Sequence, residues 1–426
     1  MRIKEVNISN FRCIRELKLD FHERMNIFVG INGSGKSSIL NCLSLLLLQL
    51  FIKMKNIKGK GRLFSENDIT VGESLTKNSI KISWHLRNAA EEVGWCMTKD
   101  SGRKKTKSDF NGLNKFVQKI YDEPDQSNRP DLPIGVYYPV NRYVIDIPLQ
   151  IREHETEQLT TACQTLSSGR NGFSSFFKWF RNREDLENEE RIYQSDYRDR
   201  QLEAVRTATE SFLPGFQNLR VRRSPLRMTV QKGTEEIIVD QLSDGEKCLL
   251  AMAGDLARRL AIANPSASNP LHGKGVVMID EIDLHLHPSW QRMIVPLLES
   301  TFPDCQFILT THSAQVLSHV RNPGSIFLLK FTDHGIQAGH PESVYGLDSN
   351  RILEDLMEVP ERPGEIKILI EKLFDTIDKK DLEKARHQLG SLKQNIGSDP
   401  QLTKAEVDIT VRQPGVRSSS EGAGPV

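Results

Sequence analysis

MNIFVGINGSGKSS, at residues 25–38, is the stretch that decides the fold. A short apolar run leads into the spacing G-x-x-x-x-G-K-S, which starts at Gly30 and ends on Gly35, Lys36 and Ser37. Such glycines let successive backbone N–H groups point at a triphosphate, and a helix that begins near Lys36 adds the positive end of its dipole. The pattern predicts a P-loop in which Lys36 reaches the β and γ phosphates and Ser37 binds Mg²⁺. A glycine-rich turn that only imitates a P-loop is the alternative, and the Lys-Ser pair after a strand disfavours it.

Length and composition set the class of protein. With 426 residues the chain has room for two or three domains, or for one large nucleotide-binding domain with insertions. A formal net charge of +1 argues against a protein that wraps nucleic acid along its whole surface. The six cysteines form no C-x-x-C pair, which excludes a zinc ribbon of that type and favours a reduced, cytoplasmic chain.

No membrane segment is expected. The N-terminal residues 1–12 lack the apolar core of a signal peptide. The apolar stretch at 39–52 is too short to span a bilayer and predicts a buried helix after the P-loop.

Several stretches of the N-terminal third have two interpretations. Alternating side chains at 2–8 and 14–21 predict two antiparallel strands, and the turn Asn10-Phe11-Arg12 between them lies near the nucleotide or is an ordinary hairpin turn. Basic loops at 53–62 and 99–107 contact nucleic-acid phosphates or are solvated loops.

The rest of the chain alternates strands with helices. A buried strand within 134–142 makes Asn141 and Arg142 site candidates, because polar side chains emerge where it ends. Further expected elements are helices at 171–216 and 248–262, strands at 226–231, 236–240, 275–279, 307–309 and 326–329, and a helical pair at 348–402. This order predicts an α/β fold whose largely parallel sheet is covered on both faces. The tail from 413 has almost no apolar content and is expected to be disordered.

Three polar side chains follow predicted strands of that sheet. Asp280 ends an apolar strand beside the P-loop, where it can hold the water shell of Mg²⁺ together with Ser37. Glu281 is then the base or water-orienting group for attack on the γ phosphate, or a structural ion pair. His312 follows the next strand, where it can stabilise the γ phosphate.

A second anion site is suggested by Ser243-Asp244-Gly245-Glu246. Ser243 and Glu246 have the spacing of a capping box, which is sufficient as a structural explanation. A helix N-terminus with free N–H groups also binds anions. His285 and His287 are not assigned to a metal, because two imidazoles do not complete a tetrahedral shell.

The order of these motifs resembles an ABC-type ATPase of the branch that includes RecF, the SMC proteins and the OLD-like ATPases. The resemblance implies a P-loop NTPase with a mostly parallel central sheet, an N-terminal antiparallel β-subdomain and a helical insertion. The implied divisions are an N-terminal ATPase lobe (1–142), a mainly helical insertion (143–225), a C-terminal ATPase lobe (226–345), a partner-binding helical segment (346–412) and a disordered tail (413–426).

The resemblance also implies roles for individual residues in a Mg²⁺-dependent ATPase. Ser243 to Glu246 belong to the signature that binds the γ phosphate held by the other protomer, Asp283 to the D-loop that couples the two sites, and His312 is the switch histidine. Asn141 and Arg142 stand about where a Gln-loop is expected. The implied catalytic residues are Glu281 and His312, the metal ligands Ser37 and Asp280, and the nucleotide-binding residues Arg12, Asn32, Gly33, Ser34, Gly35, Lys36, Ser37, Ser38, Ser243, Asp244, Gly245, Glu246 and Asp283.

Three differences from other members of this branch and from transport ATPases indicate which subgroup the chain resembles most. The chain has neither the long heptad arrays of an SMC protein nor room for a Toprim nuclease after the ATPase, and Asp244 replaces the Gly usual in transport ATPases. It is most similar to the ATPase subunit of Septu-type antiphage systems, also found beside retrons. That similarity implies an ATP-hydrolysing regulatory subunit that forms a head-to-tail dimer and controls a separate HNH nuclease, with a retron reverse transcriptase and its nucleic acid as further partners. The alternative, motivated by the two basic loops, is a RecF-like DNA-repair ATPase that binds DNA directly.

Overall fold

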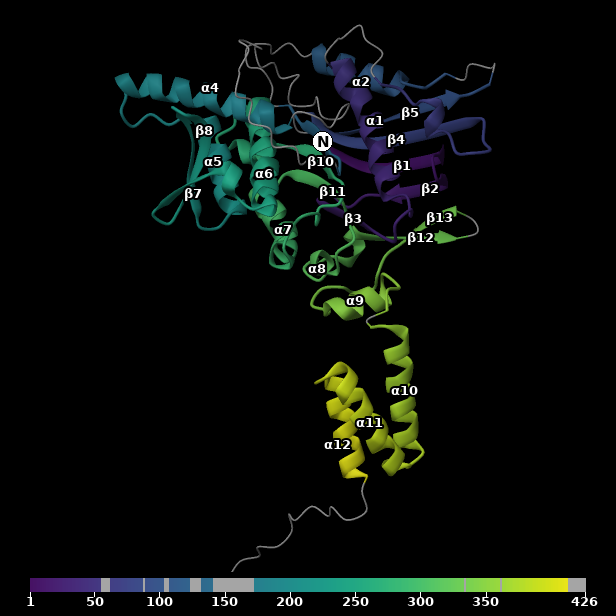
Figure 1. Ribbon diagram of the computed structural model, residues 1–426. Helices are drawn as coiled ribbons and strands as arrows, with labels where there is room; N and C mark the ends of the chain where they lie inside the picture. Colours follow the sequence, from purple (N-terminus) through teal and green to yellow (C-terminus); the bar gives the residue numbers. More distant parts are fainter. Residues whose placement is uncertain are drawn as a thin grey trace, which may run out of the picture. The chain divides into compact units, whose positions relative to one another are not determined.

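The computed structural model describes residues 1–54, 62–86, 89–102, 107–122, 132–140, 172–332, 335–360 and 362–412. The chain divides into two units, Met1–Ile352 and Leu353–Val426 (Figure 1). Most of the first basic loop, residues 103–106 of the second, Asn141, Arg142 and the predicted disordered tail lie outside the described residues.

The central sheet of the first unit carries the P-loop. Its order is β13-β12-β3-β11-β10-β6, and all neighbouring pairs are parallel except β12 with β13. The strands are β3 (Met25–Val29), β6 (Ile134–Tyr138), β10 (Gly275–Ile279), β11 (Cys305–Thr311), β12 (Ile326–Thr332) and β13 (Gly335–Gly339). The β3, β6, β10 and β11 strands are buried along their whole length, as expected of parallel strands covered on both faces. The predicted α/β fold is confirmed.

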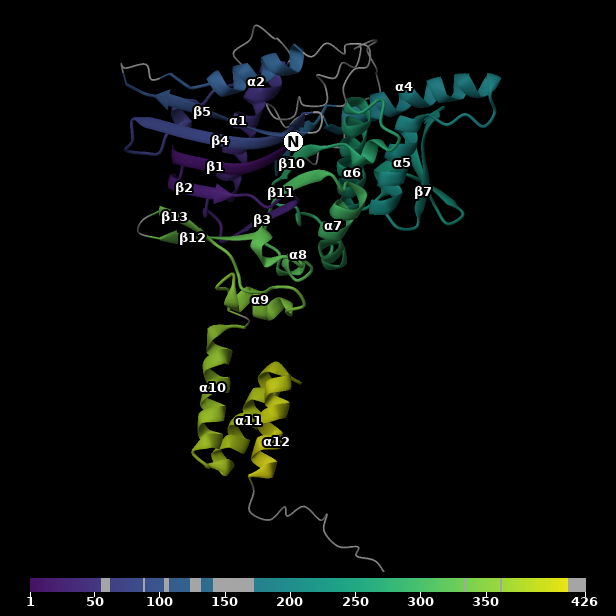
Figure 2. The same cartoon turned by 180° about the vertical axis from the view of Figure 1, so that it is seen from behind.

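Two helices cover opposite faces of this sheet at β6. Neighbouring residues of a strand point to opposite faces. Tyr137 accepts a hydrogen bond from Asn41 of α1 (Lys36–Met54), whereas Tyr138 donates one to Asp255 of α6 (Asp244–Ala263). Both views draw α1 and α6 apart, with β10 and β11 between them (Figure 1 and Figure 2).

The helix after the P-loop is longer than predicted. Among the described residues, α1 is the one helix long and apolar enough to cross a membrane. The helix has 19 residues and extends beyond the apolar stretch at 39–52 in both directions. The expectation that this segment is too short to span a bilayer was therefore wrong. Because 67% of its apolar window is buried inside the protein, its contacts are those of a core helix.

An antiparallel sheet forms the N-terminal β-subdomain. Its order is β2-β1-β4-β5, and β1 pairs with β2 as predicted. The strands are β1 (Arg2–Phe11), β2 (Ile14–Asp20), β4 (Leu75–Leu86) and β5 (Ala89–Asp100). The following helix α2 (Asn111–Tyr121) packs Phe116 edge-on against Trp84 of β4. A short helical turn, Glu66–Asp68, lies beside the β1–β2 turn.

The helical stretch at 171–216 forms two helices, α4 (Gly172–Tyr193) and α5 (Arg200–Phe212). A three-stranded sheet follows, with strands β7 (Phe216–Arg223), β8 (Leu226–Lys232) and β9 (Glu235–Ile238). The sequence did not predict β7, because a bulge between Gln217 and Arg220 interrupts its alternation and Asn218 has a positive φ of 54°. The strand predicted at 236–240 ends at Ile238, where a helical turn begins.

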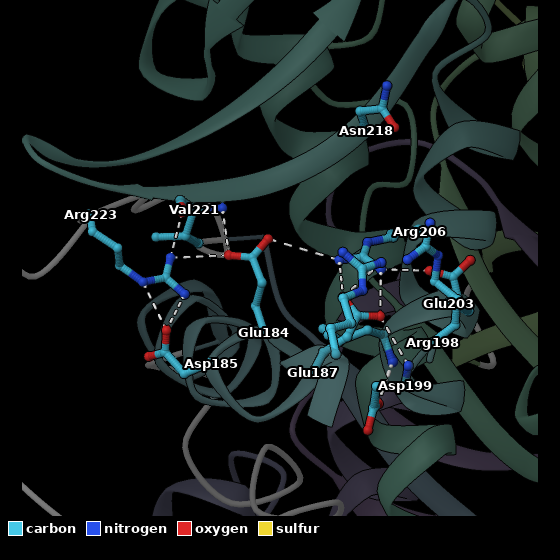
Figure 3. Close-up of polar contacts among 12 residues, drawn as sticks. Glu184, Asp185, Glu187, Arg198, Asp199, Glu203, Arg206, Asn218, Val221 and Arg223 are labelled. Atoms are coloured by element: carbon cyan, nitrogen blue, oxygen red, sulfur yellow. Dashed lines mark hydrogen bonds and ion pairs between the residues drawn. The ribbon is translucent and has the colours of Figure 1, made fainter. Parts of the chain in front are cut away.

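Buried carboxylates join α4 to α5 and β7 (Figure 3). Glu184 accepts hydrogen bonds from the Val221 amide and the Arg223 guanidinium, each at 3.0 Å. Arg206 of α5 binds Glu187 through both guanidinium nitrogens, at 3.1 and 3.0 Å. Burial raises the pKa of Glu184, which Arg223 and Arg206 oppose. Buried charges need such partners, so this cluster holds α4 against α5 and β7.

The second unit is a three-helix bundle with its own core. The helices are α10 (Gly364–Asp378), α11 (Leu382–Ile396) and α12 (Pro400–Val411), and they bury Leu373, Leu389 and Leu402 among others. The predicted helical pair was wrong: Asp399 caps and Pro400 starts a third helix, which the continuous apolar period conceals. The first unit also contains α7 (Pro288–Thr301) and α8 (Ala314–Leu317), which precede and follow β11 in the chain, and α9 (Ser349–Asp355) spans the boundary between the units.

Candidate nucleotide site

The strand order brings the predicted motifs to one edge of the central sheet. The P-loop follows β3, His312 follows β11, and Asp280 and Glu281 follow β10. Since β11 lies between β3 and β10 and all three are parallel, the carboxyl ends of these strands meet there. This is the edge where open α/β sheets bind ligands.

The P-loop backbone requires glycine at its tightest positions. A side chain at Gly30 would come within 2.5 Å of the Leu329 carbonyl oxygen of β12. Gly35 has a φ of 89°, and a Cβ there would meet Ile336 of β13 at 2.6 Å. The hairpin of β12 and β13 therefore packs against the P-loop and leaves no room for a side chain at Gly30 or Gly35.

Lys36 lies inside this turn. Its ammonium donates to the carbonyl oxygens of Gly30 and Ile31, at 2.8 and 3.0 Å. Burial lowers the pKa of Lys36, and the carboxylates of Asp280 and Glu281 oppose that shift. The Lys36 ammonium thus interacts electrostatically with both acidic residues that follow β10.

The remaining P-loop residues differ in exposure. Asn32, Gly33 and Ser37 are exposed, whereas Ser34 is buried and its hydroxyl accepts from Lys36 at 3.5 Å. Ser38 is half-buried and lies beside Cys13, with 3.7 Å between its oxygen and the thiol sulfur. The Ser37 hydroxyl at the start of α1 and the Asp280 carboxylate are hard oxygen donors of the kind Mg²⁺ prefers.

Asp280 and Glu281 are held by Thr310, which sequence reasoning did not assign. The Thr310 hydroxyl donates to Asp280 Oδ1 at 2.6 Å and accepts from the Glu281 amide at 2.7 Å. Asp280 is 2% exposed, and burial, together with the Asp280 carboxylate, raises the pKa of the Tyr137 hydroxyl. Glu281 is half-buried and has a φ of 48°, a left-handed backbone that is uncommon outside glycine.

Asp283 is joined to the loop of His312 within the same chain. Its Oδ1 accepts hydrogen bonds from the Thr311 hydroxyl and from the His312 amide. Gln291 of α7 donates to the Asp283 carbonyl at 3.3 Å and accepts from the Ser313 hydroxyl at 2.7 Å. The loops after β10 and β11 therefore form one hydrogen-bonded structure.

His312 is half-buried at the end of β11. Burial lowers its pKa, and so does the positive charge of Lys36, while Asp283 and Glu281 act in the opposite direction. The imidazole is therefore biased toward its neutral form.

Arg12 is oriented by a buried carboxylate. Its guanidinium binds Asp68 through two nitrogens, at 3.0 and 2.9 Å, and Asp68 is 1% exposed. Ser65 donates to Asp68 as well, through its amide and its hydroxyl. Asp68 was not identified from the sequence, since it lies 56 residues from Arg12.

The Ser243–Glu246 segment starts α6 as a capping box. The Ser243 amide and hydroxyl donate to Glu246 Oε2 at 2.9 and 2.7 Å. Asp244 is exposed, and a Cβ at Gly245 would meet the His285 carbonyl oxygen at 2.8 Å. The Ser243–Glu246 segment thus lies against the loop of Asp283. His287 caps α7 by accepting from the Ser289 amide, which is a structural role.

Comparison with known proteins finds one family and several similar proteins. Residues 25–318 match the family described as "AAA domain, putative AbiEii toxin, Type IV TA system". The "Retron Ec83 probable ATPase" of Escherichia coli is 30% identical, over 97% of this chain and 87% of its own. The "Septu protein PtuA" of Bacillus thuringiensis is 25% identical, over 90% of this chain and 91% of its own. An SMC head domain from Thermotoga maritima, 17% identical, has a TM-score of 0.43 over 80% of this chain and 100% of that chain.

The similarity to the retron and Septu ATPases that the motifs suggest is confirmed by matches over most of the chain. The family match spans the P-loop, both acidic residues after β10 and His312. The chain therefore belongs to this AAA-domain family, and it is an ATPase.

Proposed function

We propose that this ATPase is the regulatory subunit of an antiphage defence complex in the cytoplasm, where it controls a separate HNH-type nuclease. The observation that carries the proposal is the match over nearly the whole chain to proteins named for a retron and for Septu. In this proposal the ATPase lobes are 1–142 and 226–345, separated by the insertion at 143–225. The helical segment at 346–412 binds the partner, and a retron reverse transcriptase with its nucleic acid is a further partner.

The site residues have distinct roles in hydrolysis. Lys36 and the amides of Asn32 to Ser38 bind the phosphates, and Arg12 contacts the nucleotide. Ser37 and Asp280 hold Mg²⁺, which neutralises charge on the β and γ phosphates when bound. Glu281 orients or deprotonates the attacking water, and His312 stabilises the γ phosphate. The support is the common sheet edge and the charge coupling of Lys36 to Asp280 and Glu281.

The site is completed by a second copy of the chain. Ser243 to Glu246 bind the γ phosphate held by the partner copy in a head-to-tail dimer, and Asp283 couples the two sites. Support comes from the placement of α1 and α6 on opposite faces of the sheet. Further support is the contact between Gly245 and the loop of Asp283, which in turn bonds the His312 loop.

Light scattering with and without Mg²⁺-ATP tests the dimer. Glu281→Gln should bind ATP, hydrolyse it at least 100-fold more slowly and remain paired, because only the chemical step is blocked. Lys36→Ala should neither hydrolyse ATP nor pair. Pairing of Lys36→Ala equal to that of the unaltered chain would contradict a dimer held by shared ATP.

Copurification with the product of the adjacent gene tests the regulatory role. We expect a stable complex whose DNA cleavage changes between ATP, ADP and the Glu281→Gln variant. An ATPase that neither binds the neighbouring nuclease nor alters its cutting under any nucleotide condition contradicts the proposal. Salt-dependent, ATP-dependent DNA binding by the isolated chain would favour the RecF-like alternative instead.

A further inference from the structure

Two consecutive threonines end β11, and the first of them bonds both acidic residues that follow the neighbouring strand β10. Thr310 and Thr311 are fully buried, at 0% exposed. The Thr310 hydroxyl donates to Asp280 Oδ1 at 2.6 Å and accepts from the Glu281 amide at 2.7 Å. A hydroxyl offers one hydrogen and two lone pairs, so a single atom meets both residues with the correct polarity.

The backbone after β10 is fixed largely by the same residue. The Asp280 amide donates to the Tyr138 carbonyl at 2.9 Å, and the Ile282 amide donates to the Thr310 carbonyl at 3.0 Å. Together with the Glu281 amide, three successive N–H groups have defined partners, and two of these partners belong to Thr310. The left-handed φ of 48° at Glu281 costs free energy and persists only where the surroundings over-determine it.

We infer that Thr310 is a positioning residue for ATP hydrolysis, which sets the direction of the Asp280 carboxylate and of the Glu281 side chain. The inference rests on the roles proposed for Asp280 and Glu281. By donating to Oδ1, the hydroxyl fixes the rotation of the Asp280 carboxylate. By accepting the Glu281 amide, it fixes the peptide from which the proposed base projects. A displacement of about 1 Å at such a group costs on the order of 100-fold in rate.

A purely structural role makes a different prediction. Buried hydroxyls are hydrogen-bonded throughout proteins, and removing one leaves an unsatisfied partner that lowers stability. Such a loss acts on the folded fraction and leaves the turnover of folded molecules unchanged. The decisive readout is therefore kcat against KM in folded protein, with a variant that restores only the hydroxyl.

The experiment measures Mg²⁺-dependent ATP hydrolysis by the full chain with Thr310→Val and Thr310→Ser. Val has nearly the shape of Thr without the hydroxyl, so we expect kcat to fall about 30- to 100-fold with KM for ATP within about threefold. Ser restores the hydroxyl and should return kcat to within about threefold. If Thr310→Val is insoluble, Thr310→Ala also removes the hydroxyl and gives the same test.

Thr76→Val is the matched control. Thr76 is equally buried, at 0% exposed, and its hydroxyl donates to the Ser9 carbonyl at 2.8 Å in the N-terminal sheet. It should lose stability as Thr310→Val does but keep the kcat of the unaltered chain. The inference is overturned if folded Thr310→Val keeps kcat within threefold, or if Thr310→Ser is as slow as Thr310→Val. Glu281→Gln, measured alongside, distinguishes failure of the proposed function from failure of this inference. Full turnover by Glu281→Gln would contradict Glu281 as the base. An inactive Glu281→Gln together with a fully active Thr310→Val would contradict only the role of Thr310.

Discussion

Tyr137 and Tyr138, neighbours on β6, bond helices on opposite faces of the central sheet. The Tyr137 oxygen accepts from Asn41 of α1, and Tyr138 donates to Asp255 of α6 at 2.9 Å. Asp255 is 2% exposed and also binds Arg258 and Arg259. One strand thus connects the helix that follows the P-loop with the helix that begins at the Ser243 cap.

The two tyrosines should affect different steps. We expect Tyr138→Phe to weaken ATP-induced pairing by about three- to tenfold, because it removes one hydrogen bond to a charged group on the signature helix. Tyr137→Phe should instead lower kcat by a similar factor, since the Tyr137 hydroxyl interacts with the Asp280 carboxylate. Sedimentation velocity and steady-state hydrolysis distinguish the two. Equal changes in pairing and in kcat for the two variants would contradict separate roles for Tyr137 and Tyr138.

His312 should titrate below the ordinary histidine value of about 6.5. Burial is the main cause, and Lys36 adds to it. Proton NMR of the histidine C2–H groups, assigned with His312→Asn, measures this pKa in nucleotide-free protein. Lys36→Met should raise the value, because it removes one of the two causes that lower it. A pKa at or above the ordinary value would contradict burial as the main influence on the imidazole.

The same shift has a consequence for stability. A folded-state pKa below the unfolded one means that the unfolded chain takes up the proton first as the pH falls. The contribution of neutral His312 to stability is therefore complete above the unfolded value and declines as the pH falls from there toward the folded value. His312→Asn should reduce the loss of stability over that interval.

The ion pairs of the insertion should differ sharply in their contributions. Arg206→Met removes the bidentate partner of Glu187, which is 1% exposed, and should lower the free energy of unfolding by about 3 kcal/mol. Arg222→Met breaks an exposed pair with Glu236 and should leave the free energy of unfolding nearly unchanged, because solvent screens that pair. Urea unfolding followed by tryptophan fluorescence compares them. Equal losses would mean that burial of Glu187 does not control the cost.

The sequence predicted the parts of this molecule whose signals are local. The P-loop, the strands at β10 and β11 and the cap at Ser243 each depend on residues adjacent in the chain, so spacing and polarity were sufficient. The residues that orient them were missed for the opposite reason. Thr310 reaches Asp280 across 30 residues, and Asp68 reaches Arg12 across 56.

A bulge and a helix break explain the fold errors. The irregular register at Gln217 removed the alternation that would have indicated β7. In the C-terminal segment the apolar period of α11 runs on into α12 past Gly397 and Asp399. There the sequence did contain the signal, since Asp-Pro after Gly is a typical helix end followed by a new start.

The separate core of α10, α11 and α12 means that heating the chain should not produce one cooperative transition. Only the first unit contains the P-loop, so saturating nucleotide should raise its melting temperature alone; ligand at 100 times its Kd adds about 2.7 kcal/mol. The melting transition of the bundle then serves as an internal reference in every sample. In calorimetry, a variant that lowers the melting temperature of both units has lost stability in general. A variant that reduces only the nucleotide-dependent shift of the first unit has lost ATP binding.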